Sequence, residues 1–509
     1  MSIFFVRSFG ATAMLAFSAQ GALADLSAQD VWSDWKSYMT GTGYEITATE
    51  SQSGGTLTVS DLSMMMPIPD EEDVTAAISM PEIKFTENGD GTVSILLPAE
   101  FPMTVRASED DEKFTVSVTV AHDGTPMTVS GDPTAMTYDY ATSQMTVTLD
   151  SIEATGEDIP AGAVKASASL ADFVAKTTMS VTDTRSYMQS WTASSFTYNI
   201  DVREPGGDDH VSAVGTMLGV ETLGNSTVPT ELDKASDMAA LLASGFGVDA
   251  SFSYASGNSA ISIQDGSDNF AFNSTSGGGD IGMVMDASKL SYDVSQKDMD
   301  FNVTGSDIPF PIALSMAEAG FNITMPLAQS EEEQDFALGI SLRDFAVPEM
   351  LWGMIDPAGT LPHDPASVVL SLTGKGKVLF DIFDPEAMEQ VEDGDIAPGE
   401  LNAVTIEQLL VSAAGAKLTG TGDFTFNNED LVSFDGMPAP SGEANLSLSG
   451  ANTLIDKLIE MGLMSDEDAM GARMMMGMLA VPGEGEDTLN SKIEITEDGK
   501  ILANGQRLK

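Results

Sequence analysis

The chain has 509 residues, contains no cysteine, and carries 78 acidic against 22 basic residues, which gives a net charge of −56. The absence of cysteine excludes disulfide bonds, thiol catalysis and cysteine-ligated metals, and the negative charge disfavours nucleic acid and anionic lipid headgroups as partners. We interpret the acidity as a device for solubility in a saline medium, because none of the acidic runs has the spaced oxygen ligands of a calcium loop.

The N-terminus has the features of an export signal. Arg7 precedes the apolar run Ala11–Ala19, and Ala22-Leu23-Ala24 follows as a cleavage site. Residues 1–24 are therefore predicted to be a signal peptide that is removed after Ala24. The run is too short to anchor the chain in a bilayer. Because no later stretch approaches the ~20 apolar residues of a transmembrane helix, no transmembrane segment is expected after cleavage.

The mature chain is predicted to begin with a helix and to continue as strands. Residues 27–40 place Trp32 and Trp35 at helical spacing, and such a pair predicts a core anchor rather than a platform for a ligand. From Tyr44 onward, alternating apolar and polar runs are separated by turn residues such as Gly54-Gly55. This pattern is typical of serial antiparallel β-hairpins.

One stretch of the chain occurs twice. Met136–Tyr140 is repeated at Leu290–Val294, and at the same offset Met145–Thr148 is repeated at Met299–Asn302. Each copy alternates between apolar and polar residues on either side of four linking residues, so each copy is predicted to be a half-buried β-hairpin.

The repeated stretch also supplies the candidate ligand contacts. One face of the predicted strands carries an apolar row in each copy: Met145, Val147 and Leu149 in the first, and Met299, Phe301 and Val303 in the second. If the two rows align on an open surface, a ligand or partner is expected to cover it. If the units fold onto each other, the rows are simply core.

We divide the mature chain into three units. These are residues 25–185 with the N-terminal helix and a first β unit, 186–330 with a second, related β unit, and 331–509 with a C-terminal β unit and helices. A helix is expected over Leu232–Ala243, and Asn452–Met461 and Ser465–Leu479 are predicted to be packed helices.

Methionine is abundant on the last of these helices. Met470, Met474 and Met478 recur four residues apart, which predicts a buried stripe. The alternative is an adaptable binding surface, a role that methionine clusters serve elsewhere.

No catalytic pattern is recognisable. The histidines His122, His210 and His363 are far apart in sequence, and each is interpreted as a surface loop residue. The motifs of metalloproteases, serine hydrolases and phosphate-binding loops are missing from the sequence. We expect no enzymatic activity and no cofactor.

Several short motifs, most of them in the last third, resemble those of one protein family. They are Leu351-Trp352-Gly353-Met354, Asp356-Pro357, Asp364-Pro365, Asp381-Ile382-Phe383-Asp384-Pro385, Leu418-Thr419-Gly420-Thr421-Gly422, Asp435-Gly436-Met437-Pro438, Met470-Gly471-Ala472-Arg473 and Ala503-Asn504-Gly505-Gln506-Arg507-Leu508. The set is similar to the proteobacterial domain-of-unknown-function family 2125, over nearly the whole mature chain. The resemblance implies an exported, uncharacterised, envelope-associated protein, and with the signal peptide it predicts a periplasmic location.

The expected fold is mainly β. It consists of extended antiparallel sheets built of serial hairpins, with an N-terminal helix and a pair of C-terminal helices. Two functions remain open: a non-catalytic binder of a lipid-like apolar ligand on a β-sheet groove, and a structural or protein-interaction module of the cell envelope with no ligand. A continuous apolar groove would favour the first, and a filled core would favour the second.

Overall fold

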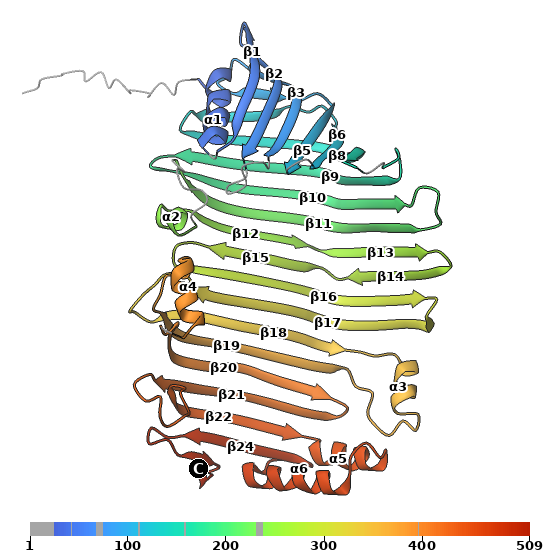
Figure 1. Ribbon diagram of the computed structural model, residues 1–509, viewed down its shortest axis with the longest axis vertical. Coiled ribbons are helices and arrows are strands. Elements are labelled where there is room, and N and C mark those ends of the chain that lie inside the picture. The colour runs from blue at the N-terminus through green and yellow to red at the C-terminus, as the bar shows by residue number, and fades with distance from the viewer. Residues whose placement is uncertain are drawn as a thin grey trace, which may run out of the picture.

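The strands form one very long antiparallel sheet. The computed structural model describes residues 25–41, 43–67, 75–109, 112–156, 159–230, 238–394 and 396–508, and every strand in this part of the chain belongs to the same 26-stranded sheet. Figure 1 shows the strands stacked as rows along the long axis, with the helices at the margins and ends. The predicted fold class is confirmed.

The element bounds are as follows. The helices are α1 (Ala28–Gly41), α2 (Met238–Ala243), α3 (Glu349–Ile355), α4 (Pro385–Glu392), α5 (Ala451–Glu460) and α6 (Asp466–Leu479). The strands are β1 (Glu45–Ser53), β2 (Thr56–Pro67), β3 (Thr75–Glu87), β4 (Val93–Leu96), β5 (Glu100–Glu109), β6 (Glu112–His122), β7 (Met127–Asp132), β8 (Ala135–Ala154), β9 (Val164–Val181), β10 (Thr184–Arg203), β11 (His210–Pro229), β12 (Gly247–Tyr254), β13 (Ser256–Asp265), β14 (Asp268–Ser276), β15 (Gly279–Met285), β16 (Lys289–Gly305), β17 (Ile308–Pro326), β18 (Gln334–Phe345), β19 (Ala366–Val378), β20 (Gly399–Ala413), β21 (Ala416–Asn427), β22 (Ala439–Ser449), β23 (Val481–Pro482), β24 (Thr488–Ile495), β25 (Ile501–Ala503) and β26 (Gln506–Arg507).

Most rows pair with the next strand in sequence. From β8 to β11 and from β16 to β22, consecutive strands pair antiparallel. Between these blocks, β12 and β13 together form one row against β11, and β15 and β14 together form the row before β16. The sheet runs without a break through positions 186 and 331, and the division into three units stays a prediction.

The prediction that each copy of the repeat is a hairpin is wrong. Each copy is a single strand, β8 or β16, and the linking residues do not turn back. Within each strand the apolar residues change from even-numbered to odd-numbered positions, because the sheet kinks at this point. In β16 the kink is Asp298, whose φ is +46°, and beside β8 it is Asp172 of β9, whose φ is +48°. In β9 and β16 one left-handed residue rotates the side chains that follow it, so both halves of each of these strands keep their apolar residues on one face.

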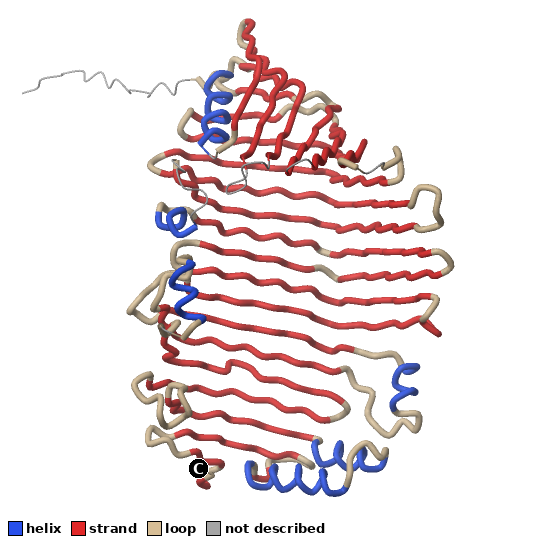
Figure 2. Tube along the Cα trace, viewed as in Figure 1, coloured by secondary structure: helices blue, strands red, loops and turns tan. Residues whose placement is uncertain are grey.

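These kinks form a crease that crosses the sheet from β9 to β18. Asp172 accepts a hydrogen bond from the Ser194 hydroxyl at 2.8 Å on β10, and the next row has Gly219 with φ +61°. The crease continues through Gly278 between β15 and β14, through Asp298, and through Asp344 at the end of β18. In Figure 2 the loop segments that separate β12 from β13 and β15 from β14 lie on this line. The strands bend at the crease, and the sheet is hollowed along its length.

The only large cluster of buried side chains in the described part lies at the N-terminal end. There the first strands curl over α1, and Trp32 packs against Phe85 with ring centroids 5.9 Å apart. Leu57, Val59 and Ile83 surround them. The predicted helix and its role as a core anchor are confirmed.

The C-terminal helices are confirmed, but their packing differs from the prediction. The Ser465 hydroxyl caps α6 by accepting a hydrogen bond from the Asp468 amide. The stripe of Met470, Met474 and Met478 is not buried, since these side chains are 67%, 65% and 55% exposed. The helical spacing places these residues on one face of α6, but none of the described elements covers that face. Of the helix expected at Leu232–Ala243, only α2 is seen, because residues 231–237 lie outside the described residues.

Candidate functional site: an apolar trough

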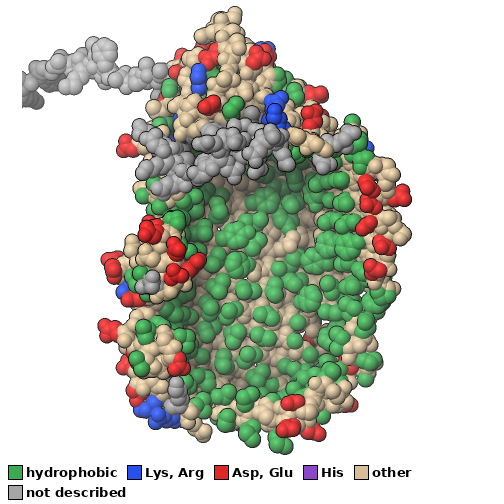
Figure 3. All heavy atoms as spheres, in the orientation of Figure 1, with side chains coloured by type: hydrophobic (Ala, Val, Ile, Leu, Met, Phe, Trp, Pro, Cys, Tyr) green, Lys and Arg blue, Asp and Glu red, His purple; other side chains and the backbone are tan. Residues whose placement is uncertain are grey.

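The hollowed face of the sheet is lined by hydrophobic side chains. Figure 3 looks onto this face, where hydrophobic side chains cover the floor and both walls, while acidic side chains lie at the rim. We call this face the trough. In the described part of the chain it extends from the C-terminal half of β8 to β24, beyond the filled N-terminal core.

The strand registers explain why the lining is continuous. Two neighbouring columns cross β16, β17, β18 and β19 in turn: Tyr292, Ile323, Leu338 and Leu372; and Val294, Phe321, Ile340 and Leu370. The intervening residues point to the outer face and are small or polar, for example Asp293, Asn322 and Ser371 on β16, β17 and β19. This alternation is the period of two that the sequence shows.

Large apolar side chains in the trough remain partly open to solvent. Ile281, Phe321 and Ile340 are 42%, 37% and 38% exposed, whereas Trp32 and Phe85 of the N-terminal core are fully buried. An exposed apolar surface that continues over many strands is larger than a soluble monomer normally shows, and such surfaces mark binding sites.

Both predicted rows of contact residues lie on the trough face. Met145 and Val147 face Leu170 and Ala168 on β9, and the pairings continue through Phe196 on β10 to the rows beyond. The second row, Met299, Phe301 and Val303, is set on β16 beside β17. The rows of β9 to β15 separate the two sets, so they share one surface without touching. Whether they contact a ligand stays a prediction.

Phe301 is supported by its neighbours on the same face. Its ring stacks on Phe272 of β14, with ring centroids 5.9 Å apart and planes at 26°. Leu314 of β17 lies opposite Phe301, and Met316 lies opposite Met299. The lining on this side of the crease is therefore also apolar.

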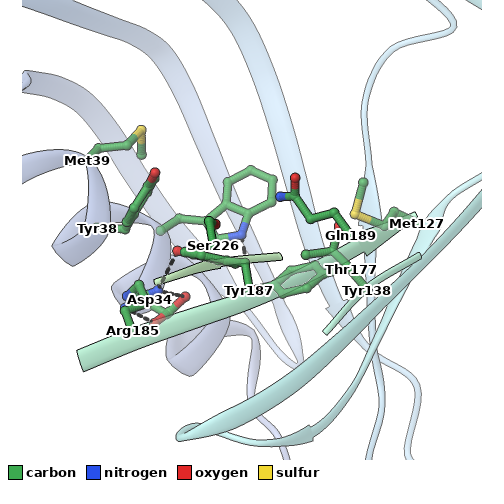
Figure 4. Close-up of a pocket in the computed structure, with 11 residues that line it drawn as sticks. Asp34, Tyr38, Met39, Met127, Tyr138, Thr177, Arg185, Tyr187, Gln189 and Ser226 are labelled. Atoms are coloured by element: carbon green, nitrogen blue, oxygen red, sulfur yellow. Dashed lines mark hydrogen bonds and ion pairs between the residues drawn. The ribbon is translucent and has the colours of Figure 1, made fainter. Parts of the chain in front are cut away.

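The N-terminal end of the trough is closed by α1. A cavity of about 510 Å³ lies between α1 and strands β7 to β11, and Figure 4 shows its lining. Arg185 donates two hydrogen bonds to Asp34 and a third to the Tyr187 hydroxyl at 3.2 Å. Trp35 donates its indole N–H to the Tyr138 hydroxyl at 3.3 Å.

Burial and charge shift the titration of the groups at this end. Burial raises the pKa of Tyr187 to about 12, and burial raises the pKa of Tyr138 further. Burial by itself would lower the pKa of Arg185, but its bonds to Asp34 and Tyr187 outweigh that effect and raise it. Arg185 is thus charged at physiological pH, and its hydrogen bonds to Asp34 hold α1 against β10.

The histidines occupy separate places. His122 bonds to the Pro98 carbonyl oxygen at 3.0 Å, and His210 lies 2.8 Å from Asp201. His363 stacks on Trp352 with ring centroids 4.5 Å apart and bonds to Glu349. In the described residues no group of three or more histidine and acidic side chains is arranged to hold a metal ion.

Sequence reasoning missed two features of this region. The crease residues were not recognised, although the change of parity around Asp172 and Asp298 is their signal. The Arg185–Asp34 pair joins residues that are distant in sequence, and no local pattern marks it.

The comparisons with known proteins identify the family. The model of the family described as uncharacterised protein conserved in bacteria (DUF2125) matches residues 248–505. The chain belongs to this family. No curated protein and no solved structure matches the chain.

The DUF2125 match begins in β12 and ends just after β25, so it covers most of the trough and none of the N-terminal core. The extension of the resemblance to α1 stays a prediction. No helix of the described residues is long and apolar enough to cross a membrane.

Proposed function

We propose that this DUF2125 protein is exported to the periplasm and binds the hydrocarbon chains of lipids in its trough, without catalysis. The observation that carries the proposal is the trough lining. It is continuous, apolar and partly exposed over row after row of the sheet, and no element of the described chain fills it.

The chemistry of the lining favours hydrocarbon over a protein segment. The backbone groups of the central rows are already paired with neighbouring strands on both sides, so an added β-strand would find no partners on this face. An amphipathic helix has one apolar stripe, and its polar sides would press against the apolar walls of a hollowed surface. A hydrocarbon chain is apolar on all sides and needs no hydrogen bond.

The expected affinity for a hydrocarbon chain is sufficient for binding at micromolar concentrations. Each buried methylene contributes roughly 0.8 kcal/mol. Burial of about ten methylenes therefore supplies about 8 kcal/mol, which corresponds to a dissociation constant near 1 μM. An ordinary acyl chain is longer than this, so incomplete burial still gives useful binding.

A matched pair of variants on β17 tests the proposal. Phe321 faces the trough, and its neighbour Asn322 is exposed on the outer face. Phe321→Asp should weaken binding of an uncharged fluorescent hydrophobic probe at least about tenfold, because the bound probe would shield the introduced carboxylate from water. Asn322→Asp adds the same charge outside and should change the affinity less than about twofold. Absence of probe binding by the folded wild type would contradict the proposal.

The nature of the natural occupant needs a second experiment. Protein purified from its native source should release lipid on solvent extraction, detected by mass spectrometry. A mass in solution twice that of one chain, with no lipid released, would instead show that a second copy covers the trough.

Export is tested separately. N-terminal sequencing of the protein from the periplasm should begin at Asp25, as the signal sequence predicts. Soluble cytoplasmic protein that retains Met1 would contradict the proposed location.

The second candidate function is a protein-interaction module of the cell envelope. It is favoured by the uncovered methionines of α6, since methionine adapts to varied partner surfaces. If the trough binds no probe, but substitution of Met470 and Met474 by serine abolishes association with a defined envelope protein, this function replaces the first.

A further inference from the structure

One small part of the trough can form hydrogen bonds. On the crease between β10 and β16, the Tyr198 hydroxyl bonds to the Ser259 hydroxyl at 2.9 Å. Nearby, the Tyr254 hydroxyl bonds to the Ser276 hydroxyl at 3.0 Å and accepts a hydrogen bond from Gln296 Nε2 at 2.8 Å. We call these five side chains the polar island.

The polar island surrounds a small cavity. Its volume is about 90 Å³, and none of the described residues that line it carries a charge. This volume suits a few non-hydrogen atoms of a ligand and is far too small for a whole lipid. A phosphate or carboxylate group in this cavity would meet no cation among the described lining residues to balance its charge. An uncharged polar group therefore fits the cavity better.

The island retains capacity for further hydrogen bonds. Each hydroxyl has one donor and two acceptor sites, of which the internal bonds use only some. In the described part of the chain, Gln296 Oε1 accepts no hydrogen bond, and it is not enclosed by protein. The site can therefore donate to a carbonyl oxygen and accept from a hydroxyl group at the same time.

Apolar lanes pass the island on both sides. On one side of the crease the lane includes Phe252, Met283 and Tyr292, and on the other it includes Ile261, Phe272 and Val303. The lanes run across the strands, along the axis of the trough.

We propose that the polar island recognises the uncharged linking group of a two-chain lipid, with ester carbonyls and a free hydroxyl, while its two chains lie in the lanes on either side. This assignment rests on the proposed function, because it places the ligand class within the same trough. An acylglycerol has this chemistry: acceptor carbonyls, one donor hydroxyl, no charge and two chains.

The test compares two competitors for the fluorescent probe. One is a diacylglycerol, and the other is a branched hydrocarbon with two chains of the same length and no oxygen. The wild type should prefer the diacylglycerol by roughly two- to tenfold, the range expected for one or two neutral hydrogen bonds. Tyr254→Phe and Gln296→Leu should each reduce this preference and leave hydrocarbon binding unchanged.

Tyr44→Phe is the matched control, because Tyr44 precedes β1 and lies outside both the trough and the island. It should retain the full preference. Equal binding of both competitors by the wild type, or an unchanged preference in both island variants, would overturn the proposal and leave the proposed function standing. A wild type that binds neither competitor nor the probe would contradict both.

Discussion

Arg185 on β10 and Asp34 on α1 form a two-point ion pair, although 151 residues separate them in the chain. The Nη2–Oδ1 distance is 2.5 Å and the Nη1–Oδ2 distance is 3.1 Å. Both side chains are only 10% exposed. Because this pair joins the helix to a strand of the trough, it holds the closed end of the trough in place.

Breaking the pair on one side should destabilise the N-terminal end. Arg185→Met leaves the Asp34 carboxylate buried without a partner and should cost about 3–5 kcal/mol of unfolding free energy. The double variant Arg185→Met/Asp34→Leu should recover most of this loss, because no charge remains buried. Urea unfolding measures both values, and a loss below 1 kcal/mol in the single variant would show that the pair is not structurally important.

The left-handed backbone at the crease leads to a prediction about stability at Asp298. Its φ of +46° is tolerated by Asp and Gly but is strained for β-branched residues. Asp298→Val should lower the free energy of unfolding by about 1–3 kcal/mol, and Asp298→Gly should change it by less than about 1 kcal/mol. Asp300→Val, in extended backbone on the same strand, is the control and should be nearly neutral. Equal stability of the two valine variants would argue against a strained crease.

The crease also shows where sequence reasoning ends. The alternation of Met136, Tyr138 and Tyr140 correctly indicated a strand, whereas the later shift to Met145 and Val147 was wrongly interpreted as the turn of a hairpin. A tight turn and a single left-handed residue both move the apolar residues from even-numbered to odd-numbered positions. The alternation alone therefore does not distinguish a hairpin from a kinked strand. The linking residues 141–144 contain no Gly, Asn or Pro, and this missing turn chemistry was the available signal.

The methionines of α6 should contribute little to stability. Met470→Ser and Met474→Ser remove side chains that are mostly exposed, so each should change the free energy of unfolding by less than about 0.5 kcal/mol. Ile455→Ala on α5 is the buried comparison and should cost about 2–4 kcal/mol. A cost of 2 kcal/mol or more for the methionine variants would mean that they are packed after all.

The pH dependence of stability is predicted at Asp487. Its carboxylate accepts hydrogen bonds from the Thr453 amide at 2.7 Å and from the Asn452 amide at 3.2 Å, at the first turn of α5. Burial alone would raise the pKa of Asp487, but these bonds together with the Asn452 side chain lower it.

Because the folded pKa is depressed, the stabilisation is fully present above the ordinary carboxyl pKa of about 3.9. It is lost as the pH falls through the folded value. Asp487→Asn should therefore cost about 1 kcal/mol at pH 7 and progressively less below pH 4. Urea unfolding of both proteins at several pH values measures the difference. A difference that stays constant into acid would contradict this role for the charge.

Other features could not be predicted from the sequence, because they depend on which elements pack against one another in the folded chain. The spacing of Met470, Met474 and Met478 placed them on one helix face. This face stays uncovered because α6 lies at the end of the sheet. The same limit applies to Met145 and Phe301. Their rows lie on the trough face, and the sequence left open whether that face is core or surface. The curl of the first strands around α1 makes it core at one end, and the crease leaves it open along the rest.

Mapping the position of a bound chain tests the central claim most directly. The wild type would be cross-linked with a photoactivatable acyl chain, and the labelled residues on β17 and β18 identified by mass spectrometry of peptides. The trough predicts labels on alternate residues, Phe321, Ile323, Ile340 and Leu342, with Asn322, Thr324, Gly339 and Ser341 unlabelled. Labels on the second set, or labels confined to α6, would contradict binding in the trough.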